Sequence, residues 1–177
     1  LIIACRLMNN TITINDKIIG YGQPCFTIAE AGVNHNGELE KALALVDVAA
    51  DSGADVVKFQ TYRPEDVVIE KGETAEYQKR NLGKVISQLE MIRGFWLDER
   101  FYPHIIKRCK ERNIIFMSTP HGGKKSVDFL ETLNVPAYKV GSGDLTNYIL
   151  LNRIAKTGKP IILSSGMATM DEVKEAT

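Results

Sequence analysis

The pattern that decides the fold is clearest in the stretch Ala137-Tyr138-Lys139-Val140-Gly141-Ser142-Gly143-Asp144. A short, mostly apolar run is followed at once by small and polar residues. Nearly continuous apolar runs of this length are typical of strands buried in a parallel sheet. Four other segments repeat the form, and their strands are predicted at residues 25–29, 55–59, 114–117 and 160–163.

Helices are predicted between these strands, because the sequence there has helical periodicity. Apolar residues recur every three or four positions in residues 38–52, 98–112, 124–133 and 148–156. Residues 74–91 contain a further helical stretch, and the spacing Thr169-x-x-Glu172 is a capping box that opens another helix. Ahead of the first strand, polar and apolar residues alternate at 11–14, and Ile18-Ile19 precede a Gly-Tyr-Gly turn. These features predict a small β-hairpin.

Strands that alternate with helices predict an α/β fold with a parallel sheet. The sheet can be open and doubly wound, or it can be part of a (β/α)8 TIM barrel. Polar residues follow all five strands, and in a barrel these ends form one ring around the active site, whereas an open sheet concentrates ligand contacts at one switch point. A complete barrel needs about 250 residues and eight strands. We therefore predict a barrel truncated after about five βα units over residues 23–177, preceded by an N-terminal extension and hairpin at residues 1–22.

The composition excludes several classes of partner. The chain has 177 residues with 22 Lys and Arg against 22 Asp and Glu, so no net positive field attracts nucleic acid. No apolar run approaches the roughly 20 residues needed to span a bilayer. The three cysteines and three histidines are dispersed, without the spacing of a redox pair or a metal site. The sequence predicts a cytoplasmic protein with reduced cysteines and with neither nucleic acid nor membrane as a partner.

Lys58 and Lys139 are the most informative polar residues, because each follows buried-type residues in a strand. A charge in such a place is costly unless it is paired or reaches the rim. One interpretation is that both lysines bind a small polyanion that carries phosphate and carboxylate, assisted by hydroxyl groups of the neighbouring loops. Those hydroxyls belong to Ser118, Thr119, Ser142, Ser164 and Ser165. The alternative is two structural ion pairs, with Glu30 and Asp144 as partners.

The loop after the first strand offers further polar groups. Glu30 can orient a substrate hydroxyl or take part in proton transfer, or it can simply hold a lysine in position. Asn34 and Asn36 are either ligand contacts or turn residues with left-handed backbone conformations. His35 is interpreted as a loop-packing residue. His121, close to the end of the third strand, is a weak candidate for contact with a ligand, and His104 on a predicted surface helix receives no catalytic weight.

Five motifs together resemble the bacterial sialic acid synthase family, and they occur in the same order. They are IAEAGVNHNG at 28–37, VKFQT at 57–61, STP at 118–120, YKVGSGD at 138–144 and GKPIILSSGM at 158–167. The family includes N-acetylneuraminate, legionaminate and pseudaminate synthases. The stretch at 77–91 looks most like the neuraminate and legionaminate branch.

The resemblance implies a barrel and a reaction. Phosphoenolpyruvate condenses with an open-chain N-acylated hexosamine, such as N-acetylmannosamine, and with water, to give a nine-carbon 2-keto sugar acid and phosphate. The family uses a divalent metal, Mn²⁺ or Mg²⁺, whose histidine ligands lie on later strands. The resemblance therefore places the metal ligands beyond residue 177 and none within this chain. It also implies a C-terminal antifreeze-like domain, absent from these 177 residues, and a homodimer when the protein is full length.

Individual roles also follow from the resemblance. The positions that match phosphoenolpyruvate contacts are Lys58, Thr119, Lys139, Ser142 and Ser164. The positions that match catalytic residues near the sugar or the reacting carbons are Glu30, Gln60 and Asp144. Candidate sugar contacts are Asn34, Asn36 and Tyr77. Two departures stand out: Asp144 replaces a Glu found in some members, and His121-Gly122-Gly123 follows the Ser-Thr-Pro motif where a pair such as Phe-Asp is usual.

Two other functions stay open on the sequence. A barrel lysine, Lys58 or Lys139, can act as a Schiff-base nucleophile in an aldolase. Alternatively, the chain is an inactive barrel fragment that serves as an assembly or binding piece.

Overall fold

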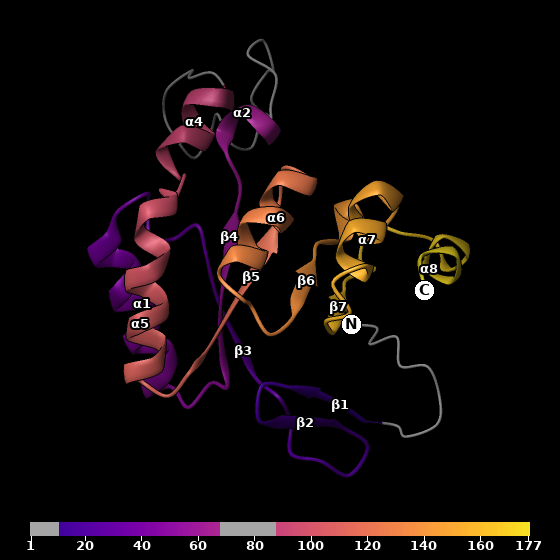
Figure 1. The fold of residues 1–177 in the computed structure, drawn as a ribbon, viewed down its shortest axis with the longest axis horizontal. Coiled ribbons are helices and arrows are strands. Elements are labelled where there is room, and N and C mark those ends of the chain that lie inside the picture. The colour runs from indigo at the N-terminus through magenta and orange to yellow at the C-terminus, as the bar shows by residue number, and fades with distance from the viewer. Residues whose placement is uncertain (1–10, 68–87) are drawn as a thin grey trace.

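The computed structural model describes residues 11–67 and 88–177. A two-stranded antiparallel hairpin comes first, and a five-stranded parallel sheet follows, with its strands side by side in chain order (Figure 1). The hairpin strands are β1 (Thr11–Ile14) and β2 (Lys17–Gly20). The parallel strands are β3 (Ile28–Gly32), β4 (Val56–Thr61), β5 (Ile115–Pro120), β6 (Tyr138–Val140) and β7 (Ile161–Leu163).

Helices fill the connections between the strands. Those that contribute to the main core are α1 (Leu39–Asp51), α5 (Tyr102–Glu111), α6 (Lys124–Thr132), α7 (Tyr148–Ala155) and α8 (Met170–Ala176). The other helical elements are α2 (Pro64–Val67), α4 (Gln88–Gly94) and the 3₁₀ turns η1 (Glu99–Phe101) and η2 (Ser142–Asp144). The capping box that opens α8 is present as predicted. No helix in 11–67 or 88–177 has the length and apolar character to cross a membrane.

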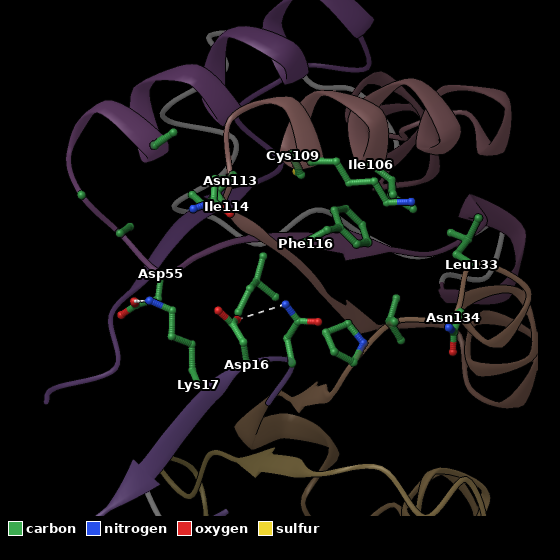
Figure 2. Close-up of a pocket in the computed structure, with 18 residues that line it drawn as sticks. Asp16, Lys17, Asp55, Ile106, Cys109, Asn113, Ile114, Phe116, Leu133 and Asn134 are labelled. Atoms are coloured by element: carbon green, nitrogen blue, oxygen red, sulfur yellow. Dashed lines mark hydrogen bonds and ion pairs between the residues drawn. The ribbon is translucent and has the colours of Figure 1, made fainter. Parts of the chain in front are cut away.

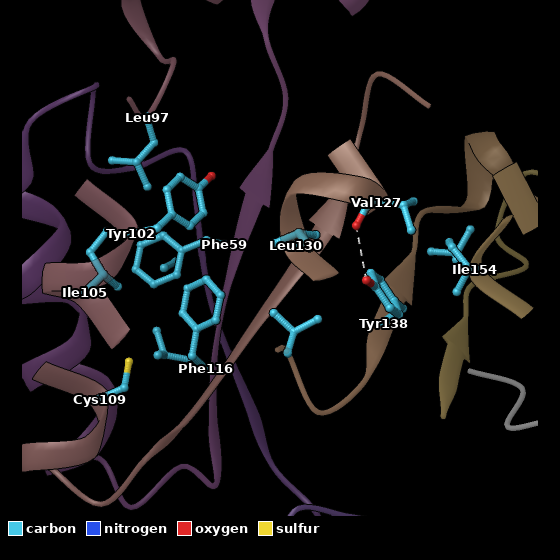
Figure 3. Packing of buried hydrophobic residues seen from close by; sticks show 14 of the residues in the cluster. Phe59, Leu97, Tyr102, Ile105, Cys109, Phe116, Val127, Leu130, Tyr138 and Ile154 are labelled. Atoms are coloured by element: carbon cyan, nitrogen blue, oxygen red, sulfur yellow. Dashed lines mark hydrogen bonds between the residues drawn. The ribbon is translucent and has the colours of Figure 1, made fainter. Parts of the chain in front are cut away.

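The two faces of the parallel sheet pack against different partners. On one face, Phe59, Phe116 and Tyr138 join the buried residues of α1, α5, α6, α7 and α8 in one core cluster (Figure 3). On the other face, Val56, Ile115 and their neighbours form a second cluster with the hairpin. Successive side chains of a strand point to opposite faces, so residues of the two clusters alternate along each strand. These five helices therefore share one face of the sheet.

The hairpin covers the amino-terminal end of the strands on the face that lacks helices. Its Ile14 is fully buried in the second cluster, and Ile12 and Ile19 pack there as well. The turn is tight because Asn15 takes a left-handed conformation with φ of 56°, which Asn tolerates better than most residues. Lys17 then forms an ion pair with Asp55 at 2.9 Å and fastens the hairpin to the start of β4.

The strand order and the one-sided helices distinguish between the two predicted closures. A doubly wound sheet reverses its strand order and carries helices on both faces. Here the order is consecutive and α1, α5, α6, α7 and α8 lie on one face. The prediction of an α/β fold with a parallel sheet is confirmed, and so is the hairpin. This winding is that of a (β/α) barrel.

Several strand boundaries were wrong in the sequence prediction, since β4 continues to Thr61 and β5 to Pro120. The first parallel strand was predicted at residues 25–29, with Glu30 just after it, but β3 begins at Ile28 and includes Glu30. The cause is Asp55, whose carboxylate accepts hydrogen bonds from the amide and the hydroxyl of Thr27 at 2.8 and 3.0 Å. These hydrogen bonds hold Thr27, and the pairing of β3 with β4 begins at the next residue, Ile28. Most of the predicted helical stretch at 74–91 lies outside the described residues.

Candidate functional site

Six of the predicted site residues lie on the face of the sheet that carries no helices. The period of two along each strand places them there, because Ile28, Val56, Met117, Ala137 and Ile162 belong to the inner cluster with the hairpin. The site residues that follow at two- or four-residue intervals are Glu30, Lys58, Gln60, Thr119, Lys139 and Ser164. They therefore stand above the apolar layer, toward the carboxyl ends of the strands, where barrel enzymes carry their active sites.

Lys58 and Glu30 form an ion pair across neighbouring strands. The two residues are paired in the β3–β4 register, and their side chains make a direct salt bridge. Lys58 is buried at 8% exposure, whereas about half of the Glu30 side chain is exposed. The ion-pair alternative is thus confirmed for this lysine. The ion pair does not exclude ligand binding at Lys58, because the exposed partner, Glu30, lies on the solvent side of the pair.

Lys139 has a different environment. Its Nζ donates to Ser164 Oγ at 2.5 Å and to the carbonyl oxygen of Val140 at 2.6 Å. Burial lowers the pKa of Lys139, the positive charge of Lys58 lowers it further, and Glu30 opposes both effects. The two lysines therefore interact electrostatically, and their site has an excess of one positive charge over Glu30. This is a favourable setting for a small anion.

Glu30 and Gln60 converge around a glycine. Gly32 has a φ of +55°, and a Cβ built there would lie 3.4 Å from Glu30 Oε1 and 3.8 Å from Gln60 Nε2. Gln60 pairs with Thr119 in the β4–β5 register. A Cβ at position 32 would make only ordinary van der Waals contacts with these two groups, so it is the positive φ that favours glycine here.

The turn after β6 carries Ser142 and Asp144. Ser142 Oγ lies 3.9 Å from the position that a Cβ on Gly166 would occupy, so the loops after β6 and β7 adjoin. Asp144 does not pair with Lys139, contrary to the ion-pair alternative. Its Oδ2 lies 3.5 Å from His121 Nδ1, and its Oδ1 accepts a hydrogen bond from Asn147 at 3.3 Å. His121 is the main cause of a lowered Asp144 pKa, and the hydrogen bond from Asn147 adds to it.

His121 is the residue that the sequence interpretation undervalued. It follows Pro120 directly, and its side chain is about one third exposed at the rim. The available signal was its place at the end of a strand, which it shares with the other site residues. What the sequence could not show was that the next strand brings an aspartate to it.

The candidate sugar contacts lie in less informative places. Asn34 and Asn36 have exposed side chains in the turn between β3 and α1, and Asn36 adopts a φ of 50°, as its alternative role predicts. Tyr77 lies outside the described residues. His35 is fully buried, accepts a hydrogen bond from the Gly37 amide at 3.0 Å and lies near Phe59, which confirms it as a packing residue.

A cavity of about 690 Å³ lies at the opposite end of the sheet (Figure 2). It is lined by the hairpin turn around Lys17, by the starts of β4 and β5, and by the loop before β6. The Lys17–Asp55 ion pair borders it. The cavity therefore belongs to the amino-terminal end of the strands and is separate from the candidate site. In the part of the chain that the structure describes, no three His, Cys, Asp or Glu side chains are grouped closely enough to hold a metal ion.

Comparison with known proteins decides the family. Residues 45–177 match the NeuB family. The chain belongs to the NeuB family. N,N'-diacetyllegionaminic acid synthase of Campylobacter jejuni is 45% identical over 149 residues, which are 84% of this chain and 44% of that protein. Human N-acetylneuraminate-9-phosphate synthase is 37% identical over 158 residues, which are 89% of this chain and 43% of that protein.

A solved NeuB-type structure shares the fold. The N-acetylneuraminic acid synthetase of Leptospira borgpetersenii, in complex with citrate, matches with a TM-score of 0.78 and 30% identity, over 94% of this chain and 53% of that one. The chain spans less than half the length of the curated NeuB relatives described above. The resemblance found in the motifs is therefore confirmed at the level of the family.

Proposed function

We propose that this NeuB chain contributes the phosphoenolpyruvate half of a nonulosonic acid synthase site. The observation that carries the proposal is the meeting of Lys58 and Lys139 on the inner face of the sheet. Phosphoenolpyruvate carries a phosphate and a carboxylate close together, and two ammonium groups suit both. The hydroxyls expected to contribute further hydrogen bonds belong to Thr119, Ser142 and Ser164.

The proposed reaction joins phosphoenolpyruvate to an N-acylated hexosamine such as N-acetylmannosamine. C3 of phosphoenolpyruvate attacks the sugar aldehyde, water adds at C2, and the tetrahedral intermediate expels phosphate by C–O cleavage. The products are a nine-carbon 2-keto sugar acid and phosphate. In this scheme the lysines bind and orient the anion, while Glu30, Gln60 and Asp144 orient the sugar and move protons.

The proposal includes parts that lie outside the described residues. A divalent Mn²⁺ or Mg²⁺ would polarise the aldehyde, but no described cluster fits such an ion, so we propose ligands beyond residue 177 and derive no step through the metal. Likewise, we propose that three further βα units close the barrel, that an antifreeze-like domain follows, and that the intact protein is a cytoplasmic homodimer.

The test is phosphate release by the intact protein that contains these residues. Phosphate should appear only when phosphoenolpyruvate, an N-acylhexosamine and Mn²⁺ or Mg²⁺ are all present. With ¹⁸O in the bridging C–O–P position, C–O cleavage sends the label into phosphate. Lys58→Met should lose phosphoenolpyruvate binding, while His104→Asn, on the exposed surface of α5, is the matched control. Release that does not need the sugar would contradict the proposal.

A Schiff-base aldolase is the second candidate, because the lowered pKa of Lys139 is also what an amine nucleophile needs. Borohydride reduction in the presence of pyruvate distinguishes the two functions. A covalent adduct on Lys139 would support the aldolase. Absence of an adduct together with sugar-dependent phosphate release would support the synthase, and absence of both would favour the inactive fragment.

A further inference from the structure

The backbone holds His121 in a fixed place at the end of β5. Its amide donates to the carbonyl oxygen of Thr61 at the end of β4, at 2.8 Å, and its own carbonyl accepts from the hydroxyl of Ser126. Gly122 follows with a φ of +85°, and a Cβ there would lie 3.2 Å from Asp66 Cβ and 3.3 Å from Ser126 Oγ. The chain therefore turns sharply behind His121, with no room for a larger residue.

The imidazole of His121 lies against the turn that follows β6. Its Cε1 would be 3.6 Å from a Cβ on Gly141, and its Nδ1 lies 3.5 Å from Asp144 Oδ2. Asn147 approaches the other carboxylate oxygen at 3.3 Å. Asp144 is thus held from two sides, by residues of two different elements. Both members of the His121–Asp144 pair keep between a quarter and a third of their side-chain surface exposed, so a ligand can reach them.

We propose that His121 is a positioning residue that fixes the Asp144 carboxylate for the proton transfers at the sugar end of the site. This inference rests on the proposed function. A carboxylate has about four lone-pair sites on its two oxygens, so bonds to His121 and Asn147 leave others for a substrate hydroxyl. A donor that holds the carboxylate also favours its charged form, which agrees with the lowered pKa of Asp144.

Other charged groups lie on the elements that neighbour this pair. Asp66 of α2 lies behind Gly122 and is paired with Lys125 of α6 at 2.6 Å. On the strands, the charged groups are Glu30, Lys58 and Lys139. The Asp66–Lys125 pair is internally neutral, and Asp144 is the charged group paired with His121.

The first experiment measures kinetics of the intact synthase with phosphoenolpyruvate and N-acetylmannosamine. His121→Phe keeps a ring but removes the donor, and it should lower kcat by about 10- to 100-fold, as small misplacements of catalytic groups do. The KM for phosphoenolpyruvate should stay within about twofold, because the lysines are unchanged. His121→Asn, whose amide nitrogen replaces Nδ1, should recover most of kcat. His104→Phe, at an exposed position of α5, is the control.

The pH profile and a double variant test whether His121 acts through Asp144. Without the donor, the pKa of Asp144 rises, so the acid limb of kcat in His121→Phe should move to higher pH. The variant carrying both His121→Phe and Asp144→Asn should be no slower than Asp144→Asn alone, since residues that act as a unit are not additive. A wild-type kcat and acid limb in His121→Phe, or fully additive losses, would overturn the proposal.

A binding-independent measurement separates this proposal from the proposed function. In protein labelled with ¹³C-aspartate, Asp144 is assigned by the signal missing from Asp144→Asn, and its titration is followed by NMR. His121→Phe should raise the pKa of Asp144, because the donor that favours the charged carboxylate is lost. If this rise is found in a protein that does not catalyse the reaction, the pair stands and the proposed function fails. An unchanged Asp144 pKa in His121→Phe would overturn the pair, whatever the activity.

Discussion

Glu30 is predicted to compete with the anionic substrate for Lys58. Replacing it by Gln keeps the size of the side chain but leaves Lys58, which is only 8% exposed, beside Lys139 without a counter-charge. Breaking a fully buried pair costs about 3–5 kcal/mol, and exposed pairs are worth about 0–1 kcal/mol. Because one partner is buried and the other is half exposed, we expect Glu30→Gln to lower the free energy of unfolding by about 1–2 kcal/mol.

The same change should strengthen anion binding. A phosphate group that enters the site of Glu30→Gln no longer has to displace a carboxylate, so the affinity for inorganic phosphate or phosphoenolpyruvate should rise about 5- to 30-fold, the equivalent of 1–2 kcal/mol. Turnover should fall nevertheless, because Glu30 is proposed to act on the sugar. Calorimetric titration of the intact protein measures the affinity, and urea denaturation measures the stability.

Lys58→Met is the matched variant, since it removes the buried charge and leaves an exposed carboxylate. It should change the free energy of unfolding by no more than about 1 kcal/mol, and it should weaken phosphate binding. If Glu30→Gln binds phosphate more weakly than the wild type, or if Lys58→Met is the more destabilising of the two, the competition for Lys58 is refuted.

Three further predictions concern other parts of the chain. Ile14→Ala should cost about 2–4 kcal/mol in urea denaturation by opening the buried layer beneath the site, whereas Ile18→Ala, on the exposed side of the hairpin, should cost less than about 0.5 kcal/mol. Burial lowers the pKa of His35 to about 4, below its ordinary value of 6.5; stability present above pH 6.5 should therefore be lost as the pH falls toward 4, by up to about 3 kcal/mol, and His35→Gln should lack this slope. Phosphate affinity should fall as the pH rises through the lowered pKa of Lys139, and Lys139→Arg, which stays charged, should abolish this alkaline loss in calorimetric titrations from pH 7 to 10.

The winding of the sheet could be predicted because its signals are local and repeated. Each strand is a short apolar run that ends in polar residues, and the period of two along it fixes which side chains share a face. The sequence therefore predicts that Lys58 and Lys139 lie at the same mouth of the sheet. The start of β3 could not be predicted, because it depends on a hydrogen bond from the Thr27 amide to Asp55, which lies 28 positions away in the sequence.

The pairing of His121 with Asp144 was beyond sequence reasoning for a related cause. The two residues lie 23 positions apart, and only the lateral packing of β5 against β6 brings them together. Sequence chemistry offered Lys139 as a partner for Asp144, since opposite charges attract. The structure instead directs the Lys139 ammonium to Ser164, which directly follows β7, on the side away from β5. Which neighbour a polar side chain selects is thus decided by strand adjacency.

The consecutive strand order also bears on how the protein is made. Each parallel strand pairs with the one synthesised just before it, so no strand has to be inserted between two earlier ones. Chains emerge amino end first at about 5–20 residues per second, which allows each βα unit to dock on its predecessor during translation. The hairpin is the exception. Ile14 is synthesised before the parallel strands, yet the cluster that buries it includes Ile162 of β7. The apolar surface of the hairpin therefore stays exposed until β7 is made, and this is where a chaperone would be most useful.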